Sequence, residues 1–318
     1  MSRAEGKPEP GDDTLWRLKR QGCEGVLILG AGYCGARLAR ALQHRGIRVV
    51  TTSRSEPPAG AASAASLQLQ RRFDPGQGVL LADSDLDGIS HVLVSIPPDA
   101  EGRDPSLAPL QGLLAGRPLQ WLGYLSTTGV YGDTGGEWVT EADTPRPSQA
   151  RSQARLRAEQ AWRCSGLAAR LIRLPGIYGP GRSSLEQVSA GRARRVIKAG
   201  QVFSRVHVDD IVGALLHLMG LPPGDHPEVV NVADDLPCAA SEVVEEAARL
   251  LGCNPPPARS FEEVRDSMSP MALSFWQDNR RVSNRLLRDG LGYRLKHPTY
   301  REGLRAVLME QRGGEPVP

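Results

Sequence analysis

Residues 26–35 read VLILGAGYCG and run directly into ARLARAL at residues 36–42. The apolar run predicts a buried strand, and the three glycines predict a tight turn. The apolar residues Cys34, Leu38 and Leu42 then recur at helical spacing. A strand, a G-x-G-x-x-G turn and a helix in this order predict a dinucleotide-binding site.

Each glycine of the turn has its own expected role. Gly30 permits the tight turn, Gly32 lets the backbone approach a pyrophosphate, and Gly35 lets the helix press against the strand. Amides at the helix start, around Tyr33 and Cys34, would hold the phosphate charge. The alternative is an ordinary strand-to-helix turn without a ligand.

Composition excludes several classes of function. The 39 basic and 36 acidic residues give a net charge of +3 without a dense Lys/Arg block, so nucleic acid is a poor partner. The five cysteines lack C-x-x-C spacing, which indicates neither a disulfide framework nor a metal site. No apolar stretch approaches about 18 residues, and acidic residues stand where a secretory core would be. We therefore expect a cytoplasmic protein that does not contact membranes.

Apolar runs alternate with helical patterns along the chain, whose 318 residues suffice for two unequal parts. Strands are predicted at 26–29, 47–52, 67–70, 91–96, 120–126 and 168–174, and helices at 36–42, 107–114, 151–162, 209–219, 241–251 and 300–310. The alternation predicts right-handed βαβ crossovers and a parallel sheet. The expected fold class is α/β, with a Rossmann-like doubly wound sheet and a smaller mixed C-terminal lobe.

The predicted domain boundaries follow this rhythm. Residues 1–23 are polar and are expected to be a flexible leader, although 15–18 could form a short docked helix. Residues 24–178 would form the nucleotide domain, with strand elements returning near 205–232, and 179–318 mainly a substrate lobe. Residues 55–66, rich in Pro, Gly, Ala and Ser, are expected to form a loop or weak helix.

The end of the second strand bears on the choice of dinucleotide. An NAD site would place Asp or Glu about 20 residues past the glycines to accept from the ribose hydroxyl. Ser53 and Arg54 stand there instead. A guanidinium suits a 2′-phosphate, so NADP is favoured, and NAD remains open. The alternative is that Arg54 is a solvated loop charge.

Further cofactor contacts are expected at the ends of later strands. Asp74 is placed to accept from the adenine amino group, although an Asp before Pro-Gly also serves simply as a turn residue. Ser95, Ile96 and Pro97, where the run 91–96 ends, are the other expected contacts.

Residues 124–133, YLSTTGVYGD, resemble the fifth-strand signature of extended short-chain dehydrogenases/reductases, the family of nucleotide-sugar epimerases and dehydratases. Residues 172–182, 205–211 and 230–235 agree with it in order, so the resemblance spans about residues 25–307. It implies a nicotinamide cofactor, a cofactor-facing turn at Pro175, and homodimers through helices of the large domain.

The resemblance fails at the catalytic pair. The family's substrate-binding Ser or Thr falls on Thr127, but its Tyr-x-x-x-Lys pair falls on Arg151 and Arg155. A guanidinium stays protonated above about pH 12, so Arg151 cannot replace the tyrosine as an acid. Arg155 could reach the nicotinamide ribose as the lysine does, and Arg151 could clamp an anionic substrate. The alternative is a solvated helix face with an Arg155–Glu159 ion pair.

Other candidate groups are weaker. The missing proton would come from Thr127, water, the substrate, Tyr131 or Tyr178, although buried tyrosines more often support loops. His207 is expected to be packed, with Asp209 or Asp210 capping the helix that follows. Many nucleotide-sugar enzymes of the family carry an arginine where this chain has Phe203, which speaks against a nucleotide-diphosphate sugar. Nearby positive charge remains for some anion at Arg182, Arg194, Arg195, Lys198 and Arg205.

The sequence thus predicts an NADP-dependent oxidoreductase or epimerase-like enzyme that acts on a small, anionic carbonyl or imine substrate. The alternative from another class is a catalytically eroded NADP-binding sensor or scaffold, supported by the missing tyrosine. A structural protein without ligand is a third interpretation.

Overall fold

A seven-stranded parallel sheet forms the centre of the protein, in a computed structural model that describes residues 13–56 and 67–313. The strand order is β11-β7-β5-β4-β1-β2-β3, and all pairings within it are parallel. The bounds are β1 (Gly25–Leu29), β2 (Arg48–Ser53), β3 (Gln68–Arg72), β4 (His91–Val94), β5 (Trp121–Thr127), β7 (Arg170–Leu174) and β11 (Val229–Asn231). The predicted doubly wound Rossmann-like sheet is confirmed, and its order reverses between β1 and β4.

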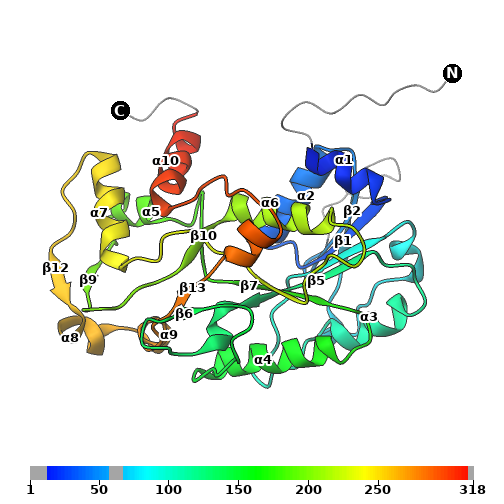
Figure 1. The fold of residues 1–318 in the computed structure, drawn as a ribbon, viewed down its shortest axis with the longest axis horizontal. Helices are drawn as coiled ribbons and strands as arrows, with labels where there is room; N and C mark the ends of the chain where they lie inside the picture. Colours follow the sequence, from blue (N-terminus) through cyan, green and yellow to red (C-terminus); the bar gives the residue numbers. More distant parts are fainter. Residues whose placement is uncertain (1–12, 57–66, 314–318) are drawn as a thin grey trace.

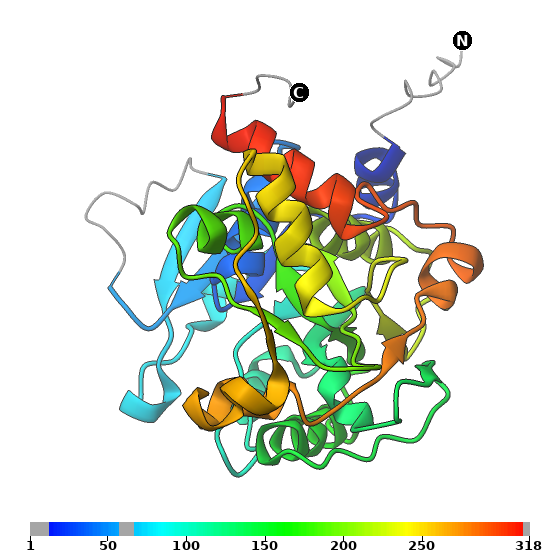
Figure 2. The same cartoon turned by 90° about the vertical axis from the view of Figure 1, so that its left-hand side faces the viewer.

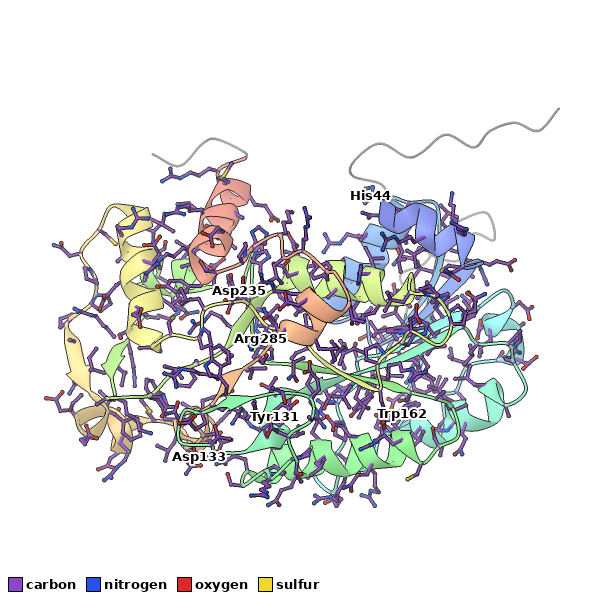
Figure 3. The ribbon with its side chains drawn as sticks, in the orientation of Figure 1. His44, Tyr131, Asp133, Trp162, Asp235 and Arg285 are labelled. Carbon is purple, nitrogen blue, oxygen red and sulfur yellow. The ribbon has the colours of Figure 1, made fainter. Side chains whose placement is uncertain are left out.

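Helices cover both faces of this sheet (Figure 1). One layer holds α1 (Asp13–Arg20), α2 (Tyr33–Gln43) and α6 (Val208–Met219), and the other holds α3 (Leu107–Leu114) and α4 (Ala150–Arg163). Successive strand residues point to opposite faces. Ile28 therefore packs in the core under α2 and α6, and its neighbour Leu27 packs in the core over α3 and α4. Trp162 of α4, marked in Figure 3, is fully buried in the second core.

A smaller lobe packs at the carboxyl edge of the sheet. Its helices are α5 (Ser184–Ser189), α7 (Ala240–Leu251), α8 (Phe261–Val264), α9 (Pro270–Phe275) and α10 (Tyr300–Gln311). Figure 2 shows α7 and α10 side by side, and they share a third apolar core. Short parallel pairs join β8 (Gly176–Tyr178) with β10 (Arg205–His207), β9 (Arg195–Ile197) with β12 (Ala258–Ser260), and β6 (Trp138–Val139) with β13 (Arg281–Val282).

Within the predicted leader, the alternative of a short docked helix at 15–18 is confirmed. Residues 13–20 form α1, because Leu18 is fully buried in the core that α6 also lines, and that burial offsets the entropy of ordering a polar segment. Residues 1–12 of the leader and 57–66 of the predicted loop lie outside the described residues. Within 13–56 and 67–313, no helix has the length and apolar character needed to cross a bilayer.

The glycine turn connects β1 to α2 as predicted. Gly30 has a φ of +89°, a left-handed conformation that favours glycine. A Cβ on Gly35 would lie 2.5 Å from the Gly30 carbonyl oxygen, so α2 presses directly on the end of β1. A Cβ on Gly32 would meet nothing within 4 Å, since this residue faces open space at the start of the helix.

His207 caps α6, which corrects the prediction that Asp209 or Asp210 would do so. The His207 Nδ1 accepts from the Asp209 backbone N–H at 3.2 Å. The Asp210 carboxylate turns away and accepts from the backbone amides of Lys296 and His297, at 2.6 and 3.0 Å. The predicted packing of His207 is confirmed, and burial, with the neighbouring His297, lowers its pKa to about 4.

Replacing Gly35 by alanine is expected to lower the free energy of unfolding by about 1–3 kcal/mol, because the added methyl group would overlap the Gly30 carbonyl. Urea denaturation measures the change as a shift in midpoint. The matched control is Gly32→Ala, which places its methyl group in open space and is expected to cost less than about 1 kcal/mol. Equal losses in the two variants would contradict this account of the turn.

Acid is expected to destabilise the fold through its buried histidines. The folded-state pKa of His207 is about 4, below the ordinary 6.5, so the unfolded chain takes up the proton first as pH falls. The contribution of neutral His207 to the free energy of unfolding is fully present above pH 6.5. About 3 kcal/mol of it is lost as the pH falls from 6.5 to 4. Burial lowers the pKa of His91 to about 4 as well, so it contributes a second, similar loss.

The test is His207→Asn, because an asparagine oxygen can still cap α6 without titrating. Denaturant unfolding at several pH values is expected to show about half the acid-dependent loss found in the parent chain. A loss of unchanged size in the variant would show that His207 does not carry this pH dependence.

Candidate active site

A cavity of about 960 Å³ lies between the carboxyl edge of the sheet and the smaller lobe. In a doubly wound sheet, ligands bind at this edge near the point where the strand order reverses. The cavity is lined by eight of the predicted site residues: Gly32, Tyr33, Cys34, Ser95, Thr127, Arg151, Arg155 and Pro175. The fold therefore brings together residues that are up to 143 positions apart, from Gly32 to Pro175.

One end of the cavity suits a dinucleotide phosphate. The amino terminus of α2 opens into it at Gly32, where backbone amides can meet an anion. The Tyr33 hydroxyl donates to the Pro180 carbonyl at 3.0 Å, which ties the glycine turn to the smaller lobe. The Arg182 guanidinium lies 5.8 Å from the centre of the Tyr33 ring. Burial raises the pKa of Cys34 to about 11, so its thiol adds no negative charge.

The other predicted cofactor residues stand at strand ends outside the cavity lining. Gly30 and Gly35 shape the turn, Ile96 and Pro97 follow β4, and Asp74 follows β3. The Ser95 hydroxyl donates to the Gly30 carbonyl at 2.6 Å, which joins the ends of β1 and β4.

Arg72 lies beside the residues at the end of β2. It was not among the residues predicted from the sequence. Ser53 pairs with Arg72 in the sheet register and donates to the Ser55 carbonyl at 2.9 Å, and the exposed Arg54 follows it. Arg72 forms an ion pair with Glu56 at 2.7 Å, and its Nε is buried without a partner. The signal for Arg72 in the sequence was the pair Arg71-Arg72 at the end of the third strand. Arg72 pairs with Ser53 across the sheet and Arg54 follows Ser53 in the chain, so two arginines adjoin Ser53.

Thr127 ends β5 with its hydroxyl directed to the cavity side of the sheet. The Thr127 Oγ1 accepts from the Gly129 backbone N–H at 3.1 Å, so its own proton remains free to be donated elsewhere. The neighbouring Ser126 differs, because its hydroxyl donates to the buried Glu159 carboxylate. Thr127 is therefore the better placed of the two to donate to a ligand.

The predicted alternative of an Arg155–Glu159 ion pair is wrong. Glu159 pairs with Arg173 of β7, at 2.7 Å between Oε2 and Nη2 and 3.1 Å between Oε1 and Nε, and the two side chains are 1% and 3% exposed. Arg155 instead donates from Nη1 to the Tyr124 hydroxyl at 3.0 Å and the Leu125 carbonyl at 3.1 Å. These bonds hold Arg155 at the cavity wall rather than on a solvated helix face.

Tyr131 and Tyr178, the two tyrosines considered as proton donors, both donate hydrogen bonds within the protein, and Tyr178 also lines the cavity. The Tyr131 hydroxyl donates to Asn231 Oδ1 at 2.8 Å, and Tyr178 donates to the Thr299 carbonyl at 3.4 Å. Tyr131, labelled in Figure 3, is buried. Burial raises the pKa of both phenols, so each supports the packing of its segment.

Positive charge dominates the cavity lining. Its charged members are the arginines Arg151, Arg155, Arg182, Arg205 and Arg280 and one acid, Asp278. Asp278 is already paired with Arg280, at 3.0 Å. Among the described residues, the other four arginines form no ion pair with a carboxylate. The cavity is therefore electrostatically suited to anions.

Three of the residues at the far side of the cavity were missed by sequence analysis. Arg280 and Asp278 precede β13, and Phe275 ends α9 with its ring 4.1 Å from the Arg151 guanidinium carbon. Their segment carries no periodic pattern that would place it against α4. The bond from Ser148 to Asp278, 3.0 Å long, joins positions 130 residues apart.

His207, Asp210 and His297 form a cluster whose candidate ligand atoms lie within 4.8 Å of one another. Both carboxylate oxygens of Asp210 already accept backbone amides, and His207 Nδ1 caps α6. The cluster therefore holds α6 against the segment that precedes α10.

Comparison with known proteins places this geometry among dinucleotide-binding folds. No family model matches the chain. Protein YeeZ of Escherichia coli (strain K12) is 29% identical over 286 residues, 86% of this chain and 96% of that protein. A 3-diazoavenalumate denitrifying reductase of Streptomyces sp is 29% identical over 177 residues, which are 51% of this chain and 55% of the reductase.

Solved structures extend the comparison. MoeE5 in complex with UDP-glucuronic acid and NAD has a TM-score of 0.71 at 21% identity, covering 91% of this chain and 99% of that chain. Human epimerase family protein SDR39U1 with NADPH has a TM-score of 0.67 at 16% identity, covering 89% and 98%. These two similarities establish the fold alone.

A structure of a functionally unknown conserved protein from Silicibacter pomeroyi DSS is nearer in sequence. It is 41% identical, with a TM-score of 0.78, and the match covers 91% of this chain and 99% of that chain. The chain therefore belongs to one family with the Silicibacter pomeroyi protein, and it has the fold of the epimerase/dehydratase-like extended short-chain dehydrogenases/reductases.

Proposed function

We propose that this protein is an NADP-dependent oxidoreductase that reduces a small carbonyl or imine compound. The observation that carries the proposal is one continuous cavity, which runs from the amino terminus of α2 past the Thr127 hydroxyl to a group of arginines without carboxylate partners. The Streptomyces relative is a reductase, which supports the reaction class. MoeE5 was solved with NAD and SDR39U1 with NADPH, which supports a nicotinamide dinucleotide, and the preference for NADP rests on Arg54 and Arg72.

The turn residues fit a dinucleotide. Gly32 leaves open space where a side chain would stand, and the α2 amides start beside it. Arg182, beside the Tyr33 ring, would add charge to a pyrophosphate, and Arg155 would lie at the nicotinamide ribose. Arg54 and Arg72, which flank Ser53, would hold a 2′-phosphate.

The bound nicotinamide would supply the hydride. The chain's own part is to orient the acceptor and to direct a proton donor at it. Because the Gly129 amide donates to Thr127 Oγ1, the threonine proton is left for the substrate oxygen or nitrogen. An imine nitrogen is more basic than a ketone oxygen, so a substrate of that kind needs less acid assistance and tolerates the loss of the tyrosine.

Replacing Arg54 by glutamine is expected to weaken NADPH binding about tenfold or more and to leave NADH binding unchanged, because only NADPH carries the phosphate. Calorimetric titration of both coenzymes measures the difference. Gly32→Ala serves as the matched control, since a methyl group at the pyrophosphate is expected to weaken both coenzymes equally. An NADPH affinity that Arg54→Gln leaves unchanged would remove Arg54 from the phosphate site.

Thr127→Val is expected to lower kcat for NADPH-dependent reduction about 100-fold, because the variant lacks the hydroxyl proton. Thr127→Ser should restore most of the rate. The measurement is NADPH oxidation over a panel of ketones and imines. Thr134→Val is the control, as this hydroxyl donates to the Glu137 carbonyl outside the cavity lining. Tight NADPH binding without turnover of any compound would favour the sensor alternative over the enzyme.

A further inference from the structure

We infer that the substrate of this cavity carries a carboxylate, held by Arg205, on an apolar body that packs against α7 and α10. The inference rests on the proposed function, because it takes the Gly32 end of the same cavity to be the coenzyme end. The arginines, their partners and the apolar lining each contribute to it.

The four arginines without carboxylate partners divide between the two ends of the cavity. Arg182 stands beside the glycine turn, and Arg155 is bonded to the end of β5, so both belong to the coenzyme end. Arg151 and Arg205 remain for the substrate. Arg151 stacks on the Phe275 ring and is exposed at the entrance, whereas Arg205 is half-buried.

Among the described residues, the direct contacts of the Arg205 guanidinium are with a thiol and an aromatic ring. Its Nη1 contacts the Cys238 sulfur at 2.7 Å, and its guanidinium carbon lies 5.5 Å from the centre of the Tyr300 ring. Burial raises the pKa of the Cys238 thiol. Among the described residues Arg205 forms no ion pair with the nearby Asp234, and burial raises the pKa of that carboxyl.

A half-buried guanidinium without a counter-ion favours an anionic ligand, because desolvation strengthens the attraction. Arg205 also stands next to the expected reaction centre. It is the register partner of Gly176, which follows Pro175 at the turn between β7 and β8, and both of these turn residues line the cavity. A carboxylate on Arg205 would therefore hold the substrate beside the coenzyme-facing turn.

The surroundings of Arg205 suit an apolar body. Phe203, Val243, Val244, Val282 and Leu304 line the same cavity as Arg205. One half-buried guanidinium that forms no ion pair among the described residues matches the single charge of a carboxylate, whereas a phosphate dianion would call for more cations. A small aromatic or branched carboxylic acid with a reducible carbonyl or imine group meets these conditions.

The test uses three probes of one shape, hydrocinnamate, hydrocinnamamide and phenethylphosphonate, which differ only in their polar group. Their dissociation constants are measured by ligand-observed NMR on the full chain, with and without NADP⁺. Hydrocinnamate is expected to bind about tenfold tighter than the amide, and at least as tightly as the phosphonate, since one charge-assisted hydrogen bond is worth about this factor. Binding is read without turnover, so a failed hydride transfer and a failed carboxylate site give different results.

Arg205→Gln is expected to reduce the preference for the carboxylate over the amide to less than about threefold, and Arg205→Lys to restore part of it. Arg40→Gln, an exposed arginine of α2, is the matched control and should keep the full preference. Equal binding of acid and amide by the parent chain would overturn the inference even if the Arg205 variants fail to fold. A preference that survives in Arg205→Gln, or a phosphonate that binds tighter than the acid, would overturn it as well.

Discussion

The buried ion pair between Glu159 and Arg173 fixes the helix on which the site depends. Both side chains are almost fully buried, the contact is bidentate, and Ser126 of β5 donates to the same carboxylate. A buried pair of this kind contributes modestly as a pair, but losing one partner costs about 3–5 kcal/mol, so α4 has one allowed placement against β5 and β7. Arg155 and Arg151 lie four and eight positions before Glu159, on the same helix face. Clamping Glu159 to the sheet therefore directs both arginines to the cavity.

The charges that line the cavity do not balance one another. The whole chain carries a net charge of only +3, yet five arginines and one acid meet in this one space. Within residues 13–56 and 67–313, four of the guanidiniums contact carbonyls, rings, a phenol or a thiol and form no ion pair with a carboxylate. Anions from a coenzyme and a substrate would serve as their counter-ions, and the local field would raise the concentration of anions at the entrance. The cavity therefore favours anionic ligands over neutral ones.

The sequence allowed the central sheet and its long helices to be predicted, because strands such as β1 and β4 are continuous apolar runs and the apolar residues of the helices repeat with a period of 3.6. The helix expected at 107–114 forms at α3 with those bounds, and the three glycines occupy the turn expected of them. The far wall of the cavity was not predictable. The Thr134 and Gly136 amides both donate to the Asn279 carbonyl, so this contact depends on hydrogen bonds between distant loops. Such bonds leave no local pattern in the sequence. For that reason the positions of Phe275 and Arg280 at the cavity could not be predicted.

This chain has Arg151 where the resemblance places the family's catalytic tyrosine. That difference limits the reactions the site could catalyse more than it affects the fold. Burial raises the pKa of all six tyrosines, so none is a stronger acid than free phenol. Tyr124 contacts Arg155, which stands at the position of the family's lysine, but its hydroxyl accepts from Arg155 and its side chain is fully buried. In the proposed reduction, proton delivery would fall to a threonine or water, both weak acids. Hydride acceptors with low proton demand fit such a site, and tight anion binding can place them there without a strong acid.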